Sequence, residues 1–136
     1  MGRNIGAAIV GVFVAVGVVW AIESIGHSVY PPPPSLDLTD AEAMRAYADA
    51  LPIGALLFVA LAWFSGTLAG TWVACRIGTA SPLAFVLIVG GLILAAAVTN
   101  LILIPHPLWF AALGTIAVLV GAWLGKMLGD TQEARG

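Results

Sequence analysis

Four long apolar runs take up most of this chain of 136 residues, and they restrict its fold more than any other feature. Each run is close to the roughly 20 residues that a helix needs to cross the hydrocarbon layer of a bilayer. A membrane β-barrel would instead show alternating polarity in segments of about ten residues, and the sequence lacks this pattern. We therefore predict an all-α membrane protein, a bundle of four transmembrane helices. The predicted spans are residues 5–28, 52–75, 82–104 and 107–127.

The composition agrees with a membrane location. Hydrophobic residues make up 61% of the chain and charged residues 9%, which leaves too little polar surface to cover a soluble domain. The first run is too long for the apolar core of a secretory signal and no small-residue cleavage site follows Trp20, so we expect it to remain as an anchor. We expect residues 1–136 to form a single membrane domain whose partner is the lipid bilayer. The net charge is −2 and no basic patch exists, so nucleic acid is not an expected partner.

The few basic residues predict the orientation in the membrane. Arg3 precedes the first span, Arg76 lies between the second and third, and Lys126 and Arg135 follow the fourth. The remaining basic residue, Arg45, lies in the first loop among four acidic residues. Because cytoplasmic loops carry an excess of Lys and Arg, both termini are predicted to be cytoplasmic. The loop of residues 29–51 and the turn of residues 105–107 should then lie on the outer side.

The predicted outer loop begins with Pro31–Pro34, a run that cannot continue a helix and favours a stiff polyproline segment. Such a run could be a docking ligand for another protein, but the sequence favours a spacer at the membrane surface. Further on, Thr39-Asp40-Ala41-Glu42 resembles a capping box, which predicts that a short helix starts at Thr39. Apolar residues on one face make this an amphipathic helix on the outer surface. They are Met44, Tyr47, Ala48 and Leu51.

Small residues recur at every fourth position in each predicted span. Helices in a bilayer associate through close backbone approach, so these residues mark contact faces. The faces could pack within one bundle, or those of the second and fourth spans could pack against another chain. A homo-oligomer or a larger membrane complex is therefore an expected form of the protein. The four faces are Ala7-Gly11-Ala15, Ala62-Gly66-Gly70-Ala74, Gly91-Ala95-Thr99 and Ala117-Gly121-Gly125-Gly129.

The polar side chains inside the predicted spans gather at one end. Glu23 lies about five residues, or roughly 7 Å of helix rise, inside the outer exit of the first span, and Asn100 lies at a similar depth in the third. His27 is four residues after Glu23 and therefore shares its face, while His106 stands between two prolines on the same side. With Tyr30, these residues predict one polar cluster at the outer end. A carboxylate inside a span is costly, which makes Glu23 a functional candidate.

Three interpretations of this cluster stay open. In the first, Glu23 is protonated or pairs with His27 and bonds to Asn100, which ties the first span to the third, while His106 caps the fourth. In the second, Glu23, His27 and His106 bind a divalent metal, because one carboxylate and two imidazoles occur in many zinc and non-haem iron sites. In the third, Glu23 changes protonation and His27 relays protons or ions. No acid or base lies at mid-membrane to continue such a path.

Motifs for soluble-type catalysis are absent from the sequence. It contains no P-loop, no dinucleotide-binding glycine motif, no nucleophile elbow and no paired catalytic cysteine and histidine. Cys75 is the only cysteine, so an intramolecular disulfide is excluded. The sequence favours a structural or interaction component that packs through its small-residue faces, rather than an enzyme. The alternative is an outer-facing, transporter-like protein that handles metal ions or protons.

Three strings of this sequence carry a resemblance to known proteins. The strings are Glu23-Ser-Ile-Gly-His27-Ser-Val-Tyr30-Pro-Pro-Pro, Leu51-Pro-Ile-Gly-Ala-Leu-Leu-Phe58 and Ile104-Pro-His-Pro-Leu-Trp-Phe110. They resemble a group of small bacterial four-span membrane proteins that carry no assigned function, and the resemblance covers most of the chain. It implies the four-span architecture and a bacterial inner-membrane location, and it implies no activity.

Overall fold

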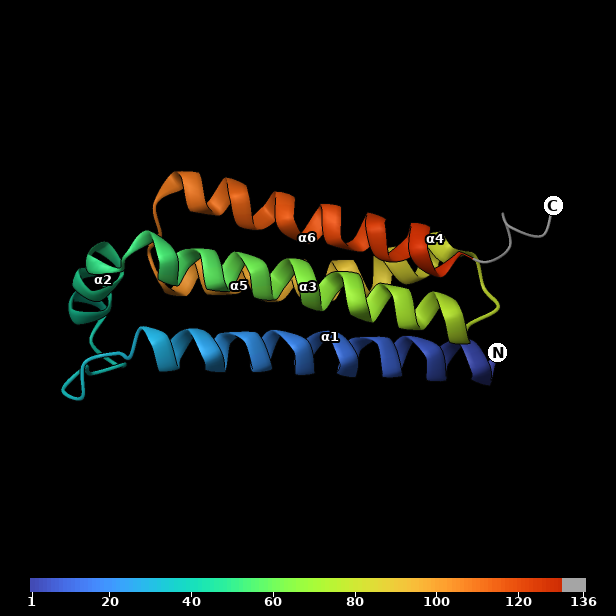
Figure 1. The fold of residues 1–136 in the computed structure, drawn as a ribbon, viewed down its shortest axis with the longest axis horizontal. Coiled ribbons are helices and arrows are strands. Elements are labelled where there is room, and N and C mark those ends of the chain that lie inside the picture. Colours follow the sequence, from blue (N-terminus) through green and yellow to red (C-terminus); the bar gives the residue numbers. More distant parts are fainter. Residues whose placement is uncertain (131–136) are drawn as a thin grey trace.

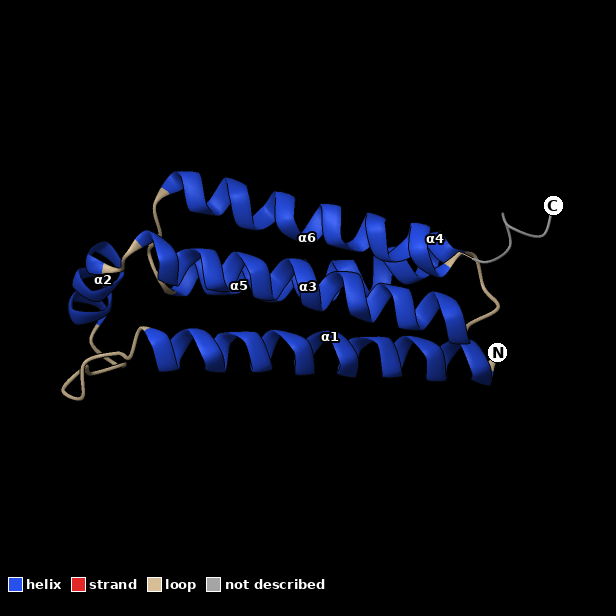
Figure 2. Cartoon of the chain, in the orientation of Figure 1, coloured by secondary structure: helices blue, strands red, loops and turns tan. Residues whose placement is uncertain are grey.

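The computed structural model describes residues 1–130 and shows four long helical segments side by side, with a short helix across one end (Figure 1). All four long segments have the length and apolar composition needed to cross a membrane, so the predicted all-α bundle is confirmed. Only helices and loops occur in the described part of the chain (Figure 2). The elements are α1 (Gly2–Val29), α2 (Ala41–Ala50), α3 (Ile53–Ile77), α4 (Pro82–Phe85), the π-helical turn η1 (Val86–Gly90), α5 (Gly91–Leu103) and α6 (Leu108–Gly129).

Helix α3 occupies the middle of the bundle. Helix α1 packs along one side of α3 and α6 along the other, and the third span, which consists of α4, η1 and α5, lies behind α3 in Figure 1. The third span contacts α1, α3 and α6 through η1. In contrast, α5 touches both α1 and α3 only sparsely. The bundle is therefore tight where α1 and α6 pack on α3, and loose where α5 faces α1 and α3.

Glycines let α1 approach α3 closely. A Cβ atom on Gly11 would lie 2.7 Å from the carbonyl oxygen of Gly70. A Cβ atom on Gly66 would lie 2.7 Å from the carbonyl oxygen of Ala15. Both separations are far below an ordinary contact, and a backbone oxygen cannot turn aside as a flexible side chain can. Close backbone approach of this kind is how helices associate where lipid removes the hydrophobic driving force.

The contact between α3 and α6 is built in the same way. A Cβ atom on Gly121 would lie 2.5 Å from the carbonyl oxygen of Phe64, and one on Gly125 would lie 2.5 Å from that of Leu68. Gly121 and Gly125 are buried against α3. The small-residue faces of the first, second and fourth spans are thus used within the chain.

The predicted small-residue face of the third span is not used for packing within the chain. Gly91, Ala95 and Thr99 are exposed, and a Cβ atom on Gly91 would meet nothing within 4 Å. On an ideal α-helix, steps of four residues drift by about 40° each, and the wider π turn at η1 compensates this drift. One face with four-residue steps therefore stays turned toward the other helices. Its buried residues are Phe85, Val89, Ile93 and Ala97.

The loop before α3 carries the short helix α2. Its N-cap is Asp40 rather than the predicted Thr39, because the Asp40 carboxylate accepts bonds from the backbone N–H groups of Glu42 and Ala43 at 2.9 and 3.2 Å. The Thr39 hydroxyl and N–H donate instead to Asp37. On the face predicted to be apolar, Ala48 is buried, and the other three residues are half-buried.

A polar contact that the sequence did not indicate holds the opposite end. The side-chain oxygen of Asn4 accepts bonds from the backbone N–H groups of Thr79 and Ala80 at 2.7 and 3.0 Å, and from the Thr79 hydroxyl at 3.1 Å. Nearby, the Arg3 guanidinium donates to the carbonyl oxygen of Ile77 at 2.7 Å. These bonds fix the start of α1 against the turn between α3 and α4.

Candidate functional site

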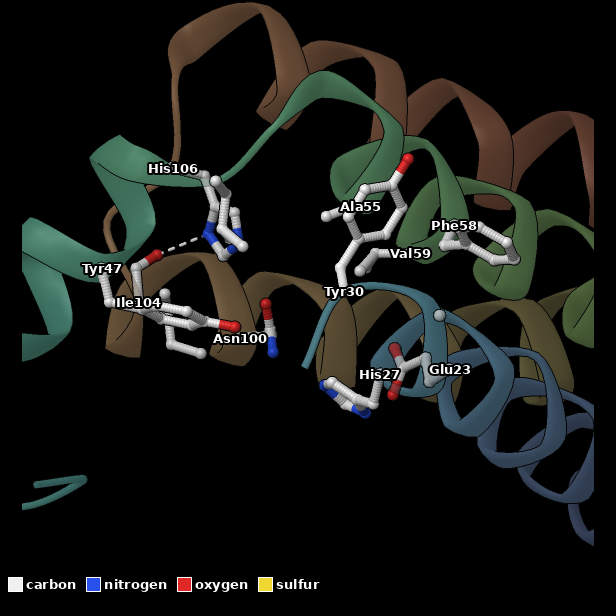
Figure 3. Close-up of a pocket in the computed structure, with 12 residues that line it drawn as sticks. Glu23, His27, Tyr30, Tyr47, Ala55, Phe58, Val59, Asn100, Ile104 and His106 are labelled. Carbon is white, nitrogen blue, oxygen red and sulfur yellow. Dashed lines mark hydrogen bonds between the residues drawn. The ribbon is translucent and has the colours of Figure 1, made fainter. Parts of the chain in front are cut away.

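A pocket of about 230 Å³ lies at the end of the bundle that carries α2, between α1, α3 and α5 (Figure 3). All five residues of the predicted polar cluster line it, so two separate spans and the turn before α6 bring them to one cavity. They are Glu23, His27, Tyr30, Asn100 and His106. Tyr47 of α2 also lines the pocket, which places this helix beside the cavity.

Two glycines shape the wall between α1 and α3. The Tyr30 ring lies directly over Gly54, where a Cβ atom would overlap the phenol hydroxyl. The ring also meets Phe58 edge to face, with the ring centroids 6.2 Å apart. A Cβ atom on Gly26 would lie 3.0 Å from the Phe58 Cβ atom. The absence of side chains at Gly26 and Gly54 therefore leaves room for the rings of Tyr30 and Phe58 beside the cavity.

His106 is fixed by two local contacts. Its Nδ1 atom lies 2.6 Å from the carbonyl oxygen of Ile104, and its ring stacks on Phe110 with the centroids 4.9 Å apart. Because a carbonyl oxygen only accepts, Nδ1 carries the hydrogen and Nε2 keeps a free lone pair. Burial lowers the pKa of His106, and the bond to Ile104 only partly offsets this, so the imidazole is neutral at pH 7. The predicted cap on α6 is wrong, since its N-cap is Pro107 and no side chain bonds there.

Glu23 and Asn100 face the same cavity without bonding to each other. The Oδ1 atom of Asn100 is buried and has no hydrogen-bond partner among the described residues. The Glu23 carboxylate interacts electrostatically with His27 and has the indole of Trp63 as a hydrogen-bonding neighbour. The predicted tie between Glu23 and Asn100 is therefore absent. Asn100 is therefore an unsatisfied group at this site, and a buried acceptor without a donor costs about 1–3 kcal/mol of stability.

The three predicted metal ligands do not come together. Glu23 and His27 lie side by side on α1, while His106 stands across the pocket (Figure 3). Within residues 1–130, no group of three or more His, Cys, Asp or Glu side chains is placed to hold a metal ion. His106 comes from the turn after α5, and its Nδ1 atom is bonded to its own backbone segment. The geometry therefore gives no support to a three-ligand metal site.

Trp63 belongs to the site, although it was not among the predicted site residues. Its indole is buried, meets the Phe110 ring at 5.7 Å between centroids and neighbours Glu23. Gly114 makes room for it, since a Cβ atom there would lie 2.6 Å from the indole. A signal was present in the sequence, because Trp63 stands three residues before Gly66, on the face through which α3 packs.

Taken together, the pocket combines three hydrogen-bond acceptors with the polar side chains of His27, Tyr30 and Tyr47, and its other walls are apolar. The acceptors are the Glu23 carboxylate, the Oδ1 atom of Asn100 and the Nε2 atom of His106. Comparison with protein-family models, with curated proteins and with solved structures finds no match to this chain. The chemistry of the pocket itself thus carries the functional argument.

Proposed function

We propose that this integral membrane protein is a binding protein that holds a small ligand with a cationic N–H group in the pocket beside Glu23. The observation that carries the proposal is the buried, unpartnered Oδ1 atom of Asn100, which lines the same cavity as the Glu23 carboxylate. A ligand that donates to Asn100 removes the cost of this unsatisfied acceptor. A positive charge on the same ligand offsets the carboxylate inside the span.

The acceptors match an ammonium group in number and kind. An ammonium group has three N–H donors and no acceptor. Glu23, Asn100 and His106 all line the cavity and each carries an acceptor, which in His106 is Nε2 because its Nδ1 hydrogen is committed to Ile104. An anionic ligand would instead face the carboxylate and find no Lys or Arg among the residues that line the pocket.

Binding is favoured over conduction of ions or protons. A conducting path needs polar side chains along the spans. A second hollow extends from Glu23 and Asn100 toward the middle of the bundle, and apart from these two residues its lining side chains are apolar. The pocket at the end of the bundle that carries α2 also has apolar walls, which suit the apolar part of a small organic ligand. These walls include Leu51, Ala55 and Val59.

The test is a titration of the protein in phosphatidylcholine nanodiscs with butylammonium, followed by calorimetry. We expect saturable binding that Glu23→Gln weakens by about tenfold or more, because a charge-assisted hydrogen bond is lost. Ser28→Ala is the matched control, since Ser28 is exposed on the same helix and bonds only to the backbone of Ser24. No saturable binding, or equal binding to the Glu23→Gln variant, would refute the proposal.

We further propose that the pocket opens on the outer side of a bacterial inner membrane, with both termini cytoplasmic. Support comes from Arg3, Arg76 and Lys126, which lie on helix ends away from α2. In a Cys75→Ser background, a membrane-impermeant maleimide applied to intact cells should label a cysteine at Ser35 in the loop before α2. A cysteine at Thr79, in the turn after α3, should stay unlabelled. The reverse pattern would overturn this orientation.

Assembly into a homo-oligomer or a larger membrane complex is a second proposal. It is favoured by the exposed small-residue face Gly91-Ala95-Thr99, which no other described helix covers. Chemical crosslinking in native membranes should trap a larger species, and Ala95→Leu should reduce it. An identical crosslinking pattern for the Ala95→Leu variant would exclude this face as the contact.

A further inference from the structure

A second cavity, a groove between α1 and α5, adjoins the pocket. This groove has a volume of about 240 Å³, and Trp63 of α3 is among the residues that line it. Glu23 and Asn100 line both the pocket and the groove, so the two cavities meet at the level of these acceptors. The remaining lining residues are apolar. They are Val16 and Val19 of α1 and Ile93, Ala96 and Ala97 of α5.

The groove runs along the spans and opens sideways. Val16 lies seven residues before Glu23, and Ile93 lies seven residues before Asn100, which corresponds to a rise of about 10 Å on each helix. Val16 is 52% exposed, and Ala96 is also exposed, so the groove faces the surroundings of the bundle. For membrane-spanning helices these surroundings are lipid tails. The sparse contact between α1 and α5 leaves this side of the bundle open.

We propose that the ligand is a cationic amphiphile with a single apolar chain, whose ammonium group binds at Glu23 and Asn100 and whose chain lies in the α1–α5 groove. This inference rests on the proposed function and names the class of its ligand. Charge complementarity selects the head group, since the acceptors stand where groove and pocket meet. A phospholipid fits poorly because its phosphate would lie beside the Glu23 carboxylate. The ligand enters from the bilayer between α1 and α5.

Groove-filling variants test the inference separately from the head-group site. Octylammonium reaches into the groove, while butylammonium occupies the pocket alone. In nanodiscs, with ligand expressed as its mole fraction in the bilayer, Ala96→Phe should weaken octylammonium binding by about tenfold and leave butylammonium binding unchanged. Ala21→Phe is the control, because Ala21 is an exposed alanine on α1 that does not line the groove. Octyl phosphate should not compete with octylammonium.

The outcomes separate the two proposals. Unchanged octylammonium binding in Ala96→Phe, with Glu23-dependent butylammonium binding retained, overturns the groove and leaves the proposed function standing. Competition by octyl phosphate, or a change in oligomeric state of Ala96→Phe without a change in octylammonium binding, also overturns it. Absence of binding by either amine overturns both proposals. An octylammonium with a photoreactive diazirine at its chain end should label Val16 and Ile93, and labelling confined to other residues refutes the placement of the chain.

Discussion

The contact between α3 and α6 at Gly121 offers a sharp test of how the bundle is held together. In Gly121→Ala, the new Cβ atom would lie 2.5 Å from the carbonyl oxygen of Phe64. This oxygen belongs to the backbone of a continuous helix and cannot rotate away. The two helices must therefore separate along their crossing, or the methyl group must compress against the carbonyl.

The magnitude follows from the size of this displacement. An ordinary non-bonded contact requires α6 to move by about 1 Å, and a gap of that size forfeits roughly a quarter to a half of the dispersion energy of each contact. Overpacking of this kind costs about 1–3 kcal/mol. Alanine is favoured over glycine inside a helix by about 0.8–1 kcal/mol, which offsets part of the cost. We expect Gly121→Ala to change the free energy of unfolding by a net loss of about 0–2 kcal/mol, against a gain of about 0.8–1 kcal/mol at a glycine with open space.

Unfolding in mixed micelles, induced by titration with dodecyl sulfate and followed by circular dichroism, measures this change. Gly17→Ala is the matched control, because Gly17 lies inside α1 and a Cβ atom there would meet nothing within 4 Å. This control should be as stable as the natural protein or slightly more stable, since only helix propensity changes. Equal stability of Gly121→Ala and Gly17→Ala would refute the reasoning that glycine sets the helix spacing.

Two further predictions concern the pocket. Because burial lowers the pKa of His106, the free energy of unfolding should be constant above about pH 6.5 and should fall as the pH drops below that value, where the unfolded chain takes up the proton first. In unfolding titrations at several pH values, His106→Gln should lose this pH dependence, while the control His27→Gln should retain it. A pH dependence that survives in His106→Gln would contradict its assignment to His106. Gly54→Ala should weaken butylammonium binding several-fold, because the new methyl group displaces the Tyr30 ring into the pocket, and an unchanged calorimetric affinity would show that the ring is not a wall of the site.

The fold was predictable because the number of spans depends mainly on the lengths of the apolar runs in the sequence. Four runs near 20 residues specify four spans whatever their packing, and prolines mark where later spans begin, as with Pro82 at the first turn of α4. Packing faces were predictable where glycine forces close approach, as at Gly66 and Gly121. They were not predictable at Gly91, because the π turn at η1 changes the helical period and no sequence signal marks it.

The sequence predicted the depth of the site along the spans, but it did not predict the hydrogen bonds within the site. Counting helix rise from the span ends placed Glu23 and Asn100 at one depth, and both line the pocket. Rotation of each helix about its axis decides whether two side chains meet, and the sequence carries no measure of it. The predicted hydrogen bond between Glu23 and Asn100 is therefore not formed. His106 bonds to the nearby carbonyl oxygen of Ile104 and neither caps α6 nor contacts Glu23 as a metal ligand would.

The most direct test of the account measures proximity between a bound ammonium group and the unsatisfied acceptor. Solid-state NMR of the protein in bilayers, with isotope-labelled octylammonium nitrogen and labelled asparagine side chains, detects such contacts. We predict magnetisation transfer from the ligand nitrogen to the side-chain carbonyl carbon of Asn100, and a marked decrease of this transfer in Glu23→Gln at the same subsaturating mole fraction of ligand. Saturating ligand without transfer to Asn100, or transfer that persists unchanged in Glu23→Gln, would contradict the account.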